Sequence, residues 1–104
     1  MENKDNKEKK IQELQILEQN IQNLLLQKQA FQMELSETKA ALKEIEKSSE
    51  IFKIVGQIMI KTEKEKIEEE LKNKEKIIEL RIGSIGKQEK SLKDRIESIK
   101  KEIF

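Results

Sequence analysis

The sequence contains neither cysteine nor histidine. Without cysteine, the chain has no disulfide framework and no thiolate metal site. Without histidine, it lacks the commonest general base and the commonest metal ligand of proteins. The cluster Gly83-Ser84-Ile85-Gly86 lies inside a helical pattern and does not resemble a phosphate-binding loop. We therefore expect no enzymatic activity and no cofactor, and we interpret the carboxylates as a solvated surface.

Long apolar runs are also missing. No run approaches the roughly 18 residues of a membrane-spanning helix, and the charged N-terminal segment lacks the apolar core of a signal peptide. We expect a cytoplasmic protein with no membrane partner. Lys and Arg number 22 against 21 Asp and Glu, a net charge of +1, which lacks the basic excess typical of nucleic-acid-binding proteins.

Charged residues make up 41% of the chain and hydrophobic residues only 35%. This composition is too polar for a compact globule, but it suffices for a narrow apolar seam between two helices. We predict one mainly α domain over 1–104. Its parts are a frayed segment 1–9, a helix over 10–49, a β-hairpin over 50–62 and a helix over 63–103.

The first predicted helix carries a coiled-coil heptad, in which apolar residues recur in alternating steps of three and four. Lys28 and Thr38 are its polar exceptions, of the kind that sets register while lowering stability. Proline is absent, so nothing ends this helix before Ser48-Ser49. The predicted seam is Leu14, Leu17, Ile21, Leu24, Lys28, Phe31, Leu35, Thr38, Leu42 and Ile45.

The second predicted helix starts at a capping box, Thr62-Glu63-Lys64-Glu65. Its apolar seam is Ile67, Leu71, Ile78, Ile82, Ile85, Leu92, Ile96, Ile99 and Ile103. This seam is the weaker one, because we assign the alternate heptad positions to the polar residues Lys74, Arg81, Gln88 and Arg95. Intrahelical ion pairs are predicted at Glu68–Lys72, Glu70–Lys74, Glu89–Lys93 and Glu97–Lys101.

Antiparallel pairing of these helices brings together residues whose numbers add up to about 112–114. Apolar residues then face each other at four levels: Leu42 and Leu71, Leu35 and Ile78, Ile21 and Leu92, Leu14 and Ile99. Phe31 falls opposite Ile82-Gly83. The glycine there either makes room for the ring or, with Gly86 and Lys28, makes the middle of the helix pair flexible.

Between the helices lies the β-like segment 51–60, which predicts a two-residue hairpin. Gly56-Gln57 suits a type II′ turn, and it pairs Val55 with Ile58, Lys53 with Ile60, and Phe52 with Lys61. One face then carries Ile51, Val55, Ile58 and Ile60, and the other carries Phe52, Ile54 and Met59. A lone hairpin cannot bury two apolar faces, so we expect it to pair with other chains, closing into a barrel.

The hairpin, Phe52-Lys53-Ile54-Val55-Gly56-Gln57-Ile58-Met59-Ile60, resembles the prefoldin family's aromatic-Lys-x-x-Gly-x motif followed by three apolar residues. The stretch from Gln27-Lys28-Gln29 through Glu37-Thr38 to Ala41-Leu42 is similar to the family's first helix. A single hairpin resembles the β-type subunit, since the α-type has two. The resemblance covers roughly 20–103.

This resemblance implies an ATP-independent chaperone subunit. In the family, two α-type and four β-type subunits join through their hairpins into a double β-barrel. The ends of the coiled-coil arms hold unfolded client proteins and pass them to a group II chaperonin. The implied assembly residues are Ile51, Phe52, Ile54, Val55, Gly56, Ile58, Met59 and Ile60. The implied client-binding residues are Ile11, Leu14, Ile16, Leu17, Ile96, Ile99, Ile103 and Phe104.

Two alternatives stay open at this point. An RNA-binding helical hairpin needs a basic stripe, but 61–81 carries seven Lys or Arg and seven Glu. A structural coiled-coil scaffold would have a disordered break at the bend, which does not account for apolar residues on both hairpin faces.

Overall fold

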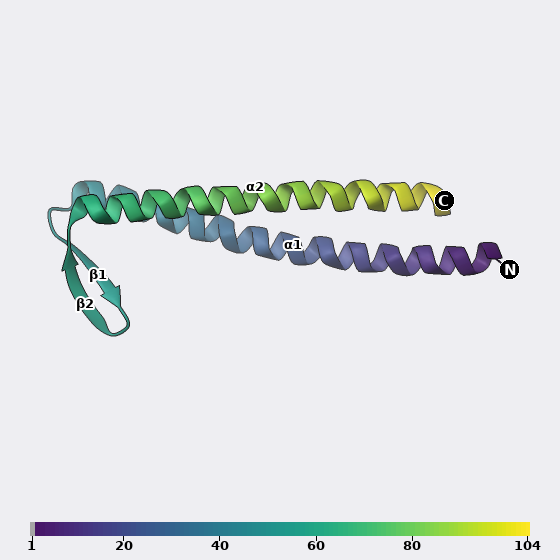
Figure 1. Cartoon of the computed structure of the whole chain (residues 1–104), viewed down its shortest axis with the longest axis horizontal. Coiled ribbons are helices and arrows are strands. Elements are labelled where there is room, and N and C mark those ends of the chain that lie inside the picture. The colour runs from purple at the N-terminus through teal and green to yellow at the C-terminus, as the bar shows by residue number, and fades with distance from the viewer. Residues whose placement is uncertain (1) are drawn as a thin grey trace. The chain divides into compact units, whose positions relative to one another are not determined.

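The computed structural model describes residues 2–104, and the side chains of 4–104. Two long helices flank a two-stranded hairpin, in the order predicted (Figure 1). The elements are α1 (Glu2–Lys47), β1 (Ile51–Val55), β2 (Ile58–Thr62) and α2 (Lys64–Ile103). The bend is thus an ordered hairpin, and the scaffold alternative with a disordered break is wrong.

Helix α1 starts earlier than the predicted first residue, 10. Met1 lies outside the described residues, and α1 already begins at Glu2. The first ten residues lack the apolar spacing of a coiled coil, but they contain no proline or glycine and are rich in Lys and Glu, which favour helix. Apolar spacing determines packing, whereas local propensity suffices to continue a helix.

The end of α1 agrees with the predicted stop at Ser48-Ser49. The Ser48 backbone N–H donates to the Ile45 carbonyl at 3.2 Å, and its hydroxyl donates to the Glu44 carbonyl at 2.9 Å. These bonds satisfy two carbonyls of the last turn that a helix end leaves free.

The start of α2 differs from the predicted capping box. Thr62 is the last residue of β2, paired with Ile51, and the Glu63 carbonyl accepts the first helical bond, from the Ile67 N–H at 3.2 Å. Glu63 is therefore the N-cap residue. Pairing in the hairpin takes precedence over the local capping signal, because Thr62 already has a strand partner.

The chain forms two compact units. Unit 1 comprises Met1–Ala30 and Ile82–Phe104, and unit 2 comprises Phe31–Arg81. That the whole chain behaves as one domain stays a prediction. Within both units, cross-helix ion pairs join residues whose numbers add up to within about five of the predicted sum, so the helix segments run antiparallel in the expected register.

Unit 2 contains the hairpin, and its register is the predicted one. Val55 pairs with Ile58, Lys53 with Ile60, and Phe52 with Lys61. Gly56 has a φ of 63°, and among residues 2–104 no residue other than glycine has a positive φ. Gln57 is therefore not left-handed, which fits the predicted type II′ turn and excludes type I′.

The seam positions predicted in α1 are all buried or half-buried. In unit 2 the buried side chains include Thr38, Ile45, Ile51 and Ile78. The Thr38 hydroxyl donates to the Glu34 carbonyl at 2.8 Å, so this polar seam residue is satisfied inside its own helix.

The α2 seam corrects one assignment. Leu71, Ile78, Ile85, Leu92 and Ile99 face inward as predicted, and so do the predicted seam residues Ile82 and Ile96. The other two alternate inward positions are Glu75 and Glu89. The residues assigned to the alternate positions, Lys74, Arg81, Gln88 and Arg95, are exposed. A heptad allows a step of three or of four from each strong position, and only packing against α1 selects between them.

The predicted role of glycine in making room for a ring is wrong. A Cβ built on Gly83 or Gly86 meets nothing within 4 Å. Both glycines therefore weaken helix propensity without a packing reason.

Candidate functional site

The hairpin of unit 2 exposes most of its apolar side chains. Ile54 is 69% exposed, and Ile58 and Met59 are nearly as exposed. Phe52, Val55 and Ile60 are about half exposed, whereas Ile51 is buried. Apolar groups are exposed on both faces, as the sequence predicted.

The hairpin also leaves two free strand edges. In the part of the chain that the structure describes, the sheet holds only β1 and β2. Val55 and Ile58 close the two-residue turn, so they form a hydrogen-bonded pair and the pairs alternate from there. Phe52 and Ile54 on β1 therefore direct their N–H and C=O groups away from β2. Each edge is ready to pair with a further strand.

Two exposed ion pairs involve hairpin lysines. The ammonium of Lys53 on β1 lies 3.4 Å from a carboxylate oxygen of Glu70 on α2. The ammonium of Lys61 on β2 lies 3.9 Å from the Glu50 carboxylate. Exposed pairs of this kind are weak, so they add little to the stability of the hairpin.

A second candidate surface lies in unit 1, where residues 10–18 of α1 meet residues 95–104 at the end of α2. We call these the tip segments. The structure divides the eight predicted client-binding residues into three groups. Ile11, Ile16 and Phe104 are exposed, Phe104 by 91%, whereas Ile99 is 0% exposed. The remaining four are half-buried in the seam, namely Leu14, Leu17, Ile96 and Ile103.

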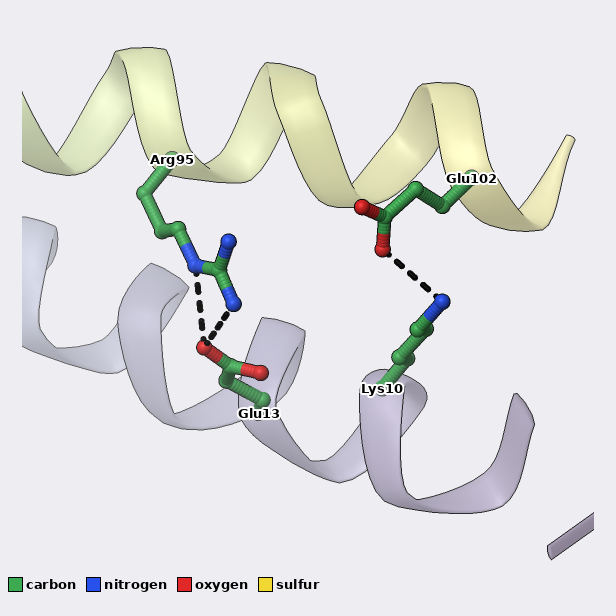
Figure 2. A network of polar contacts seen from close by, with 4 residues as sticks. All are labelled: Lys10, Glu13, Arg95 and Glu102. Atoms are coloured by element: carbon green, nitrogen blue, oxygen red, sulfur yellow. Dashed lines mark hydrogen bonds and ion pairs between the residues drawn. The ribbon is translucent and has the colours of Figure 1, made fainter. Parts of the chain in front are cut away.

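Ion pairs connect the tip segments across the seam (Figure 2). The Lys10 ammonium lies 2.9 Å from Glu102 Oε2. Arg95 donates from Nε at 3.1 Å and from Nη2 at 3.0 Å to the same oxygen of Glu13. The hydrogen bond and then the positive charge of Lys10 lower the pKa of the Glu102 carboxyl. Desolvation opposes this effect, and the charge of Arg95 adds the smallest lowering contribution.

Sequence reasoning missed these contacts. Of the predicted intrahelical pairs, Glu97–Lys101 forms, at 3.6 Å. Glu70, Lys74 and Glu89 pair instead with Lys53, Glu34 and Lys28 on other elements. The available signal was opposite charge beside facing seam positions, such as Glu13 before Leu14 and Arg95 before Ile96.

Further exposed apolar residues were also missed. They project from the outer faces of the helices: Leu25, Leu26, Met33, Ile77 and Leu80. Within residues 2–104, no helix is long and apolar enough to cross a membrane. The described residues contain no cluster of three or more His, Cys, Asp or Glu side chains that could hold a metal ion.

Comparison with known proteins agrees with this geometry. A family model described as "Prefoldin subunit" matches residues 8–103. The prefoldin subunit beta of Thermococcus onnurineus is 40% identical over 94 residues, covering 88% of this chain and 81% of the relative. That of Methanosarcina acetivorans is 35% identical over 96 residues, covering 89% and 82%.

A solved structure has the same fold. The crystal structure of the prefoldin beta subunit from Thermococcus strain KS-1 superimposes with a TM-score of 0.88 at 34% identity, covering 94% of this chain and 89% of that one. The family match extends over nearly all of the residues that build both helices and the hairpin. The chain therefore belongs to the prefoldin subunit family.

Proposed function

We propose that the chain is a β-type subunit of an ATP-independent chaperone. Its hairpin joins α-type and other β-type subunits in a hexameric barrel, and its tip segments hold unfolded proteins for delivery to a group II chaperonin in the cytoplasm. The observation that carries the proposal is the hairpin, which exposes apolar residues on both faces and has two free edges.

The energetics of the hairpin support assembly. Fully burying one large apolar side chain contributes about 1.5–3 kcal/mol. Six hairpin residues that are about half exposed or more therefore offer on the order of 5–10 kcal/mol when partner strands cover them. Ordering and association costs offset part of this gain.

A charge inside the apolar contact tests this assignment. Ile54→Asp places a carboxylate where we expect a partner strand, at a cost of several kcal/mol because a buried charge without a partner is unfavourable. Gln57→Asp is the matched control, since it adds the same charge to the same hairpin at its exposed turn. Analytical ultracentrifugation with an α-type subunit should show hexamer for the control and free subunits for Ile54→Asp. Wild-type assembly of Ile54→Asp would exclude the hairpin as the contact.

Client binding is assigned to the tip segments because the resemblance to the family places it at the ends of the coiled-coil arms, and because Ile11, Ile16 and Phe104 are exposed there. Unfolded chains present many small apolar patches, and several weak contacts at high effective concentration hold them without ATP. Truncation at Glu97 removes Ile99, Ile103 and Phe104. The truncated subunit should still assemble, but it should suppress aggregation of a denatured test protein less well.

A milder variant separates client binding from folding. Ile16→Ser with Phe104→Ser changes two exposed side chains and leaves the buried seam intact. The matched control is Leu80→Ser, which removes an apolar residue from unit 2 whose exposed fraction lies between those of Ile16 and Phe104. We expect several-fold weaker protection from the tip variant and none of this loss from the control. If the wild type, the tip variant and Leu80→Ser protect the test protein equally, the tip segments are excluded as the binding site.

A further inference from the structure

The only sulfur atoms of the chain are the thioethers of methionine. The sequence contains three methionines and no cysteine, so it offers a peroxide no thiol to oxidise. Among residues 4–104 the methionines are Met33, on the outer face of α1, and Met59, on β2. Their side chains are 67% and 65% exposed, so an oxidant in solution reaches both. Of the two, Met59 alone belongs to the surface proposed for assembly.

Met59 contributes both its backbone and its side chain to that surface. It pairs with Ile54 across the two strands and shares a hairpin face with Ile54 and Phe52. Val55 and Ile58 form the hydrogen-bonded pair next to the turn, so Ile54 and Met59 form the following non-hydrogen-bonded pair, in which side chains lie closest. The N–H and C=O groups of Met59 therefore point away from β1, at the free edge of β2. A strand that pairs with this edge packs its own side chains beside the thioether.

Oxidation converts the Met59 side chain from apolar to polar. Hydrogen peroxide transfers one oxygen atom to the sulfur, which loses two electrons, while the O–O bond breaks and the second oxygen leaves as water. In the free subunit, water solvates the sulfoxide oxygen because Met59 is mostly exposed, so the fold tolerates the change. Between paired strands the oxygen loses this water, and the strand N–H groups already donate to carbonyls. Burial of the sulfoxide without a donor is therefore unfavourable.

We propose that Met59 is a redox-sensitive modification site, at which oxidation by a peroxide stops a free subunit from entering the complex. This inference rests on the proposed assembly through the hairpin and adds its regulation. Assembled subunits escape the modification, because partner strands cover the thioether. Methionine sulfoxide reductases reverse it: two thiols reduce the sulfoxide, a disulfide forms between them and water is released. The apolar side chain and the ability to assemble are then restored.

Treatment of the free subunit with hydrogen peroxide tests the site. After removal of the oxidant and addition of an α-type subunit, analytical ultracentrifugation should show several-fold weaker hexamer formation, which methionine sulfoxide reductases and dithiothreitol restore. Met59→Leu keeps an apolar side chain of similar size and should assemble equally well before and after treatment. Met33→Leu is the matched control, because Met33 is as exposed as Met59, and it should stay as sensitive as wild type. Loss of assembly by treated Met59→Leu, or normal assembly of wild type that mass spectrometry shows to be oxidised at Met59, would overturn the proposal.

Treatment after assembly tests the protection of Met59. Peptide mass spectrometry should show that Met59 is oxidised several-fold more slowly in the complex than in the free subunit, with Met33 as the internal reference. Oxidation of Met59 at the same rate in an intact hexamer would show that no partner covers it, and the proposal would then be wrong.

A polar replacement separates this inference from the proposed assembly. Met59→Gln imitates the length and polarity of the sulfoxide and should weaken assembly several-fold without any oxidant, whereas Met33→Gln should not. If Ile54→Asp prevents assembly but Met59→Gln and the oxidised wild type assemble normally, the hairpin is the contact and Met59 is not a redox-sensitive site. If Ile54→Asp also assembles normally, both proposals fail.

Discussion

Lys28 and Glu89 form the most buried ion pair in the seam, and their removal should have unequal effects. Their charged groups lie 3.3 Å apart in unit 1. Glu89 is only 8% exposed, and its Oε1 lacks a partner with hydrogen-bond geometry. The Lys28 side chain, 31% exposed, still reaches water. We predict that Lys28→Met destabilises the chain and that Glu89→Leu does not.

The magnitude follows from competing terms. Two unit charges at this distance attract by about 5 kcal/mol at an effective dielectric constant of about 20. Desolvation of each ion costs several kcal/mol, so the intact pair contributes little net stability. Lys28→Met removes the attraction but leaves the carboxylate buried. We expect a loss of about 2–3 kcal/mol, less than the roughly 3–5 kcal/mol of fully buried pairs.

The complementary variants complete the cycle. After Glu89→Leu, the Lys28 ammonium can extend into water along its aliphatic chain, so stability should change by less than about 1 kcal/mol. The double variant Lys28→Met with Glu89→Leu should be as stable as wild type, or more stable by about 1–4 kcal/mol, because apolar residues replace both ions.

Urea unfolding followed by circular dichroism measures these differences. All variants must be compared at one protein concentration, since subunit association makes stability concentration-dependent. Lys43→Met is the control, because it removes an exposed lysine from α1 and should leave the midpoint unchanged. If Lys28→Met is no less stable than this control, the carboxylate of Glu89 does not depend on Lys28 and the reasoning is refuted.

Three further predictions follow from single sites. Gly83→Ala and Gly86→Ala should each raise the free energy of unfolding by about 1 kcal/mol, since alanine favours helix and the new methyl groups meet no atom within 4 Å. Hydrogen exchange across 78–90 should become slower. Destabilisation by either substitution would contradict this prediction. The pKa of Glu102 should lie below its usual range in an NMR titration and rise in Lys10→Gln. Because the pKa of Glu102 is lower in the folded chain than in the unfolded chain, the ionised carboxyl stabilises the fold. This stabilisation is complete above the unfolded-state pKa of about 4.3 and is lost as the pH falls through the folded-state pKa. Thr38→Val should raise the free energy of unfolding by up to about 1 kcal/mol, because a methyl group replaces a buried hydroxyl. The Glu34 carbonyl, which accepts from that hydroxyl, keeps its hydrogen bond within the helix. A lower urea midpoint would contradict this prediction.

The heptad spacing of α1 and the hairpin register could be predicted because each is a local property. Steps of three and four placed Leu14 through Ile45 on one face of a helix, since side chains seven residues apart align on it. Gly56 determined the turn, because its positive φ is sterically easy only for glycine. Apolar residues on both hairpin faces predicted the exposed surface that the structure displays.

The tip segments show what sequence spacing left undecided. The sequence marked the apolar residues there as one group, but which of them are covered depends on the opposite helix. Ile99 and Phe104 are both large apolar residues, yet Ile99 is fully buried and Phe104 is almost fully exposed.

The sequence by itself determined the elements, the turn and the antiparallel register, because these follow from local backbone preferences and apolar periodicity. Only the tertiary structure decided that Glu89, rather than Gln88, occupies the seam, and that Glu13 meets Arg95 across it. A heptad pattern allows either Gln88 or Glu89 to face the other helix, and a long charged side chain can reach several partners. The choice among them is made by packing and Coulomb attraction between helices that are distant in sequence.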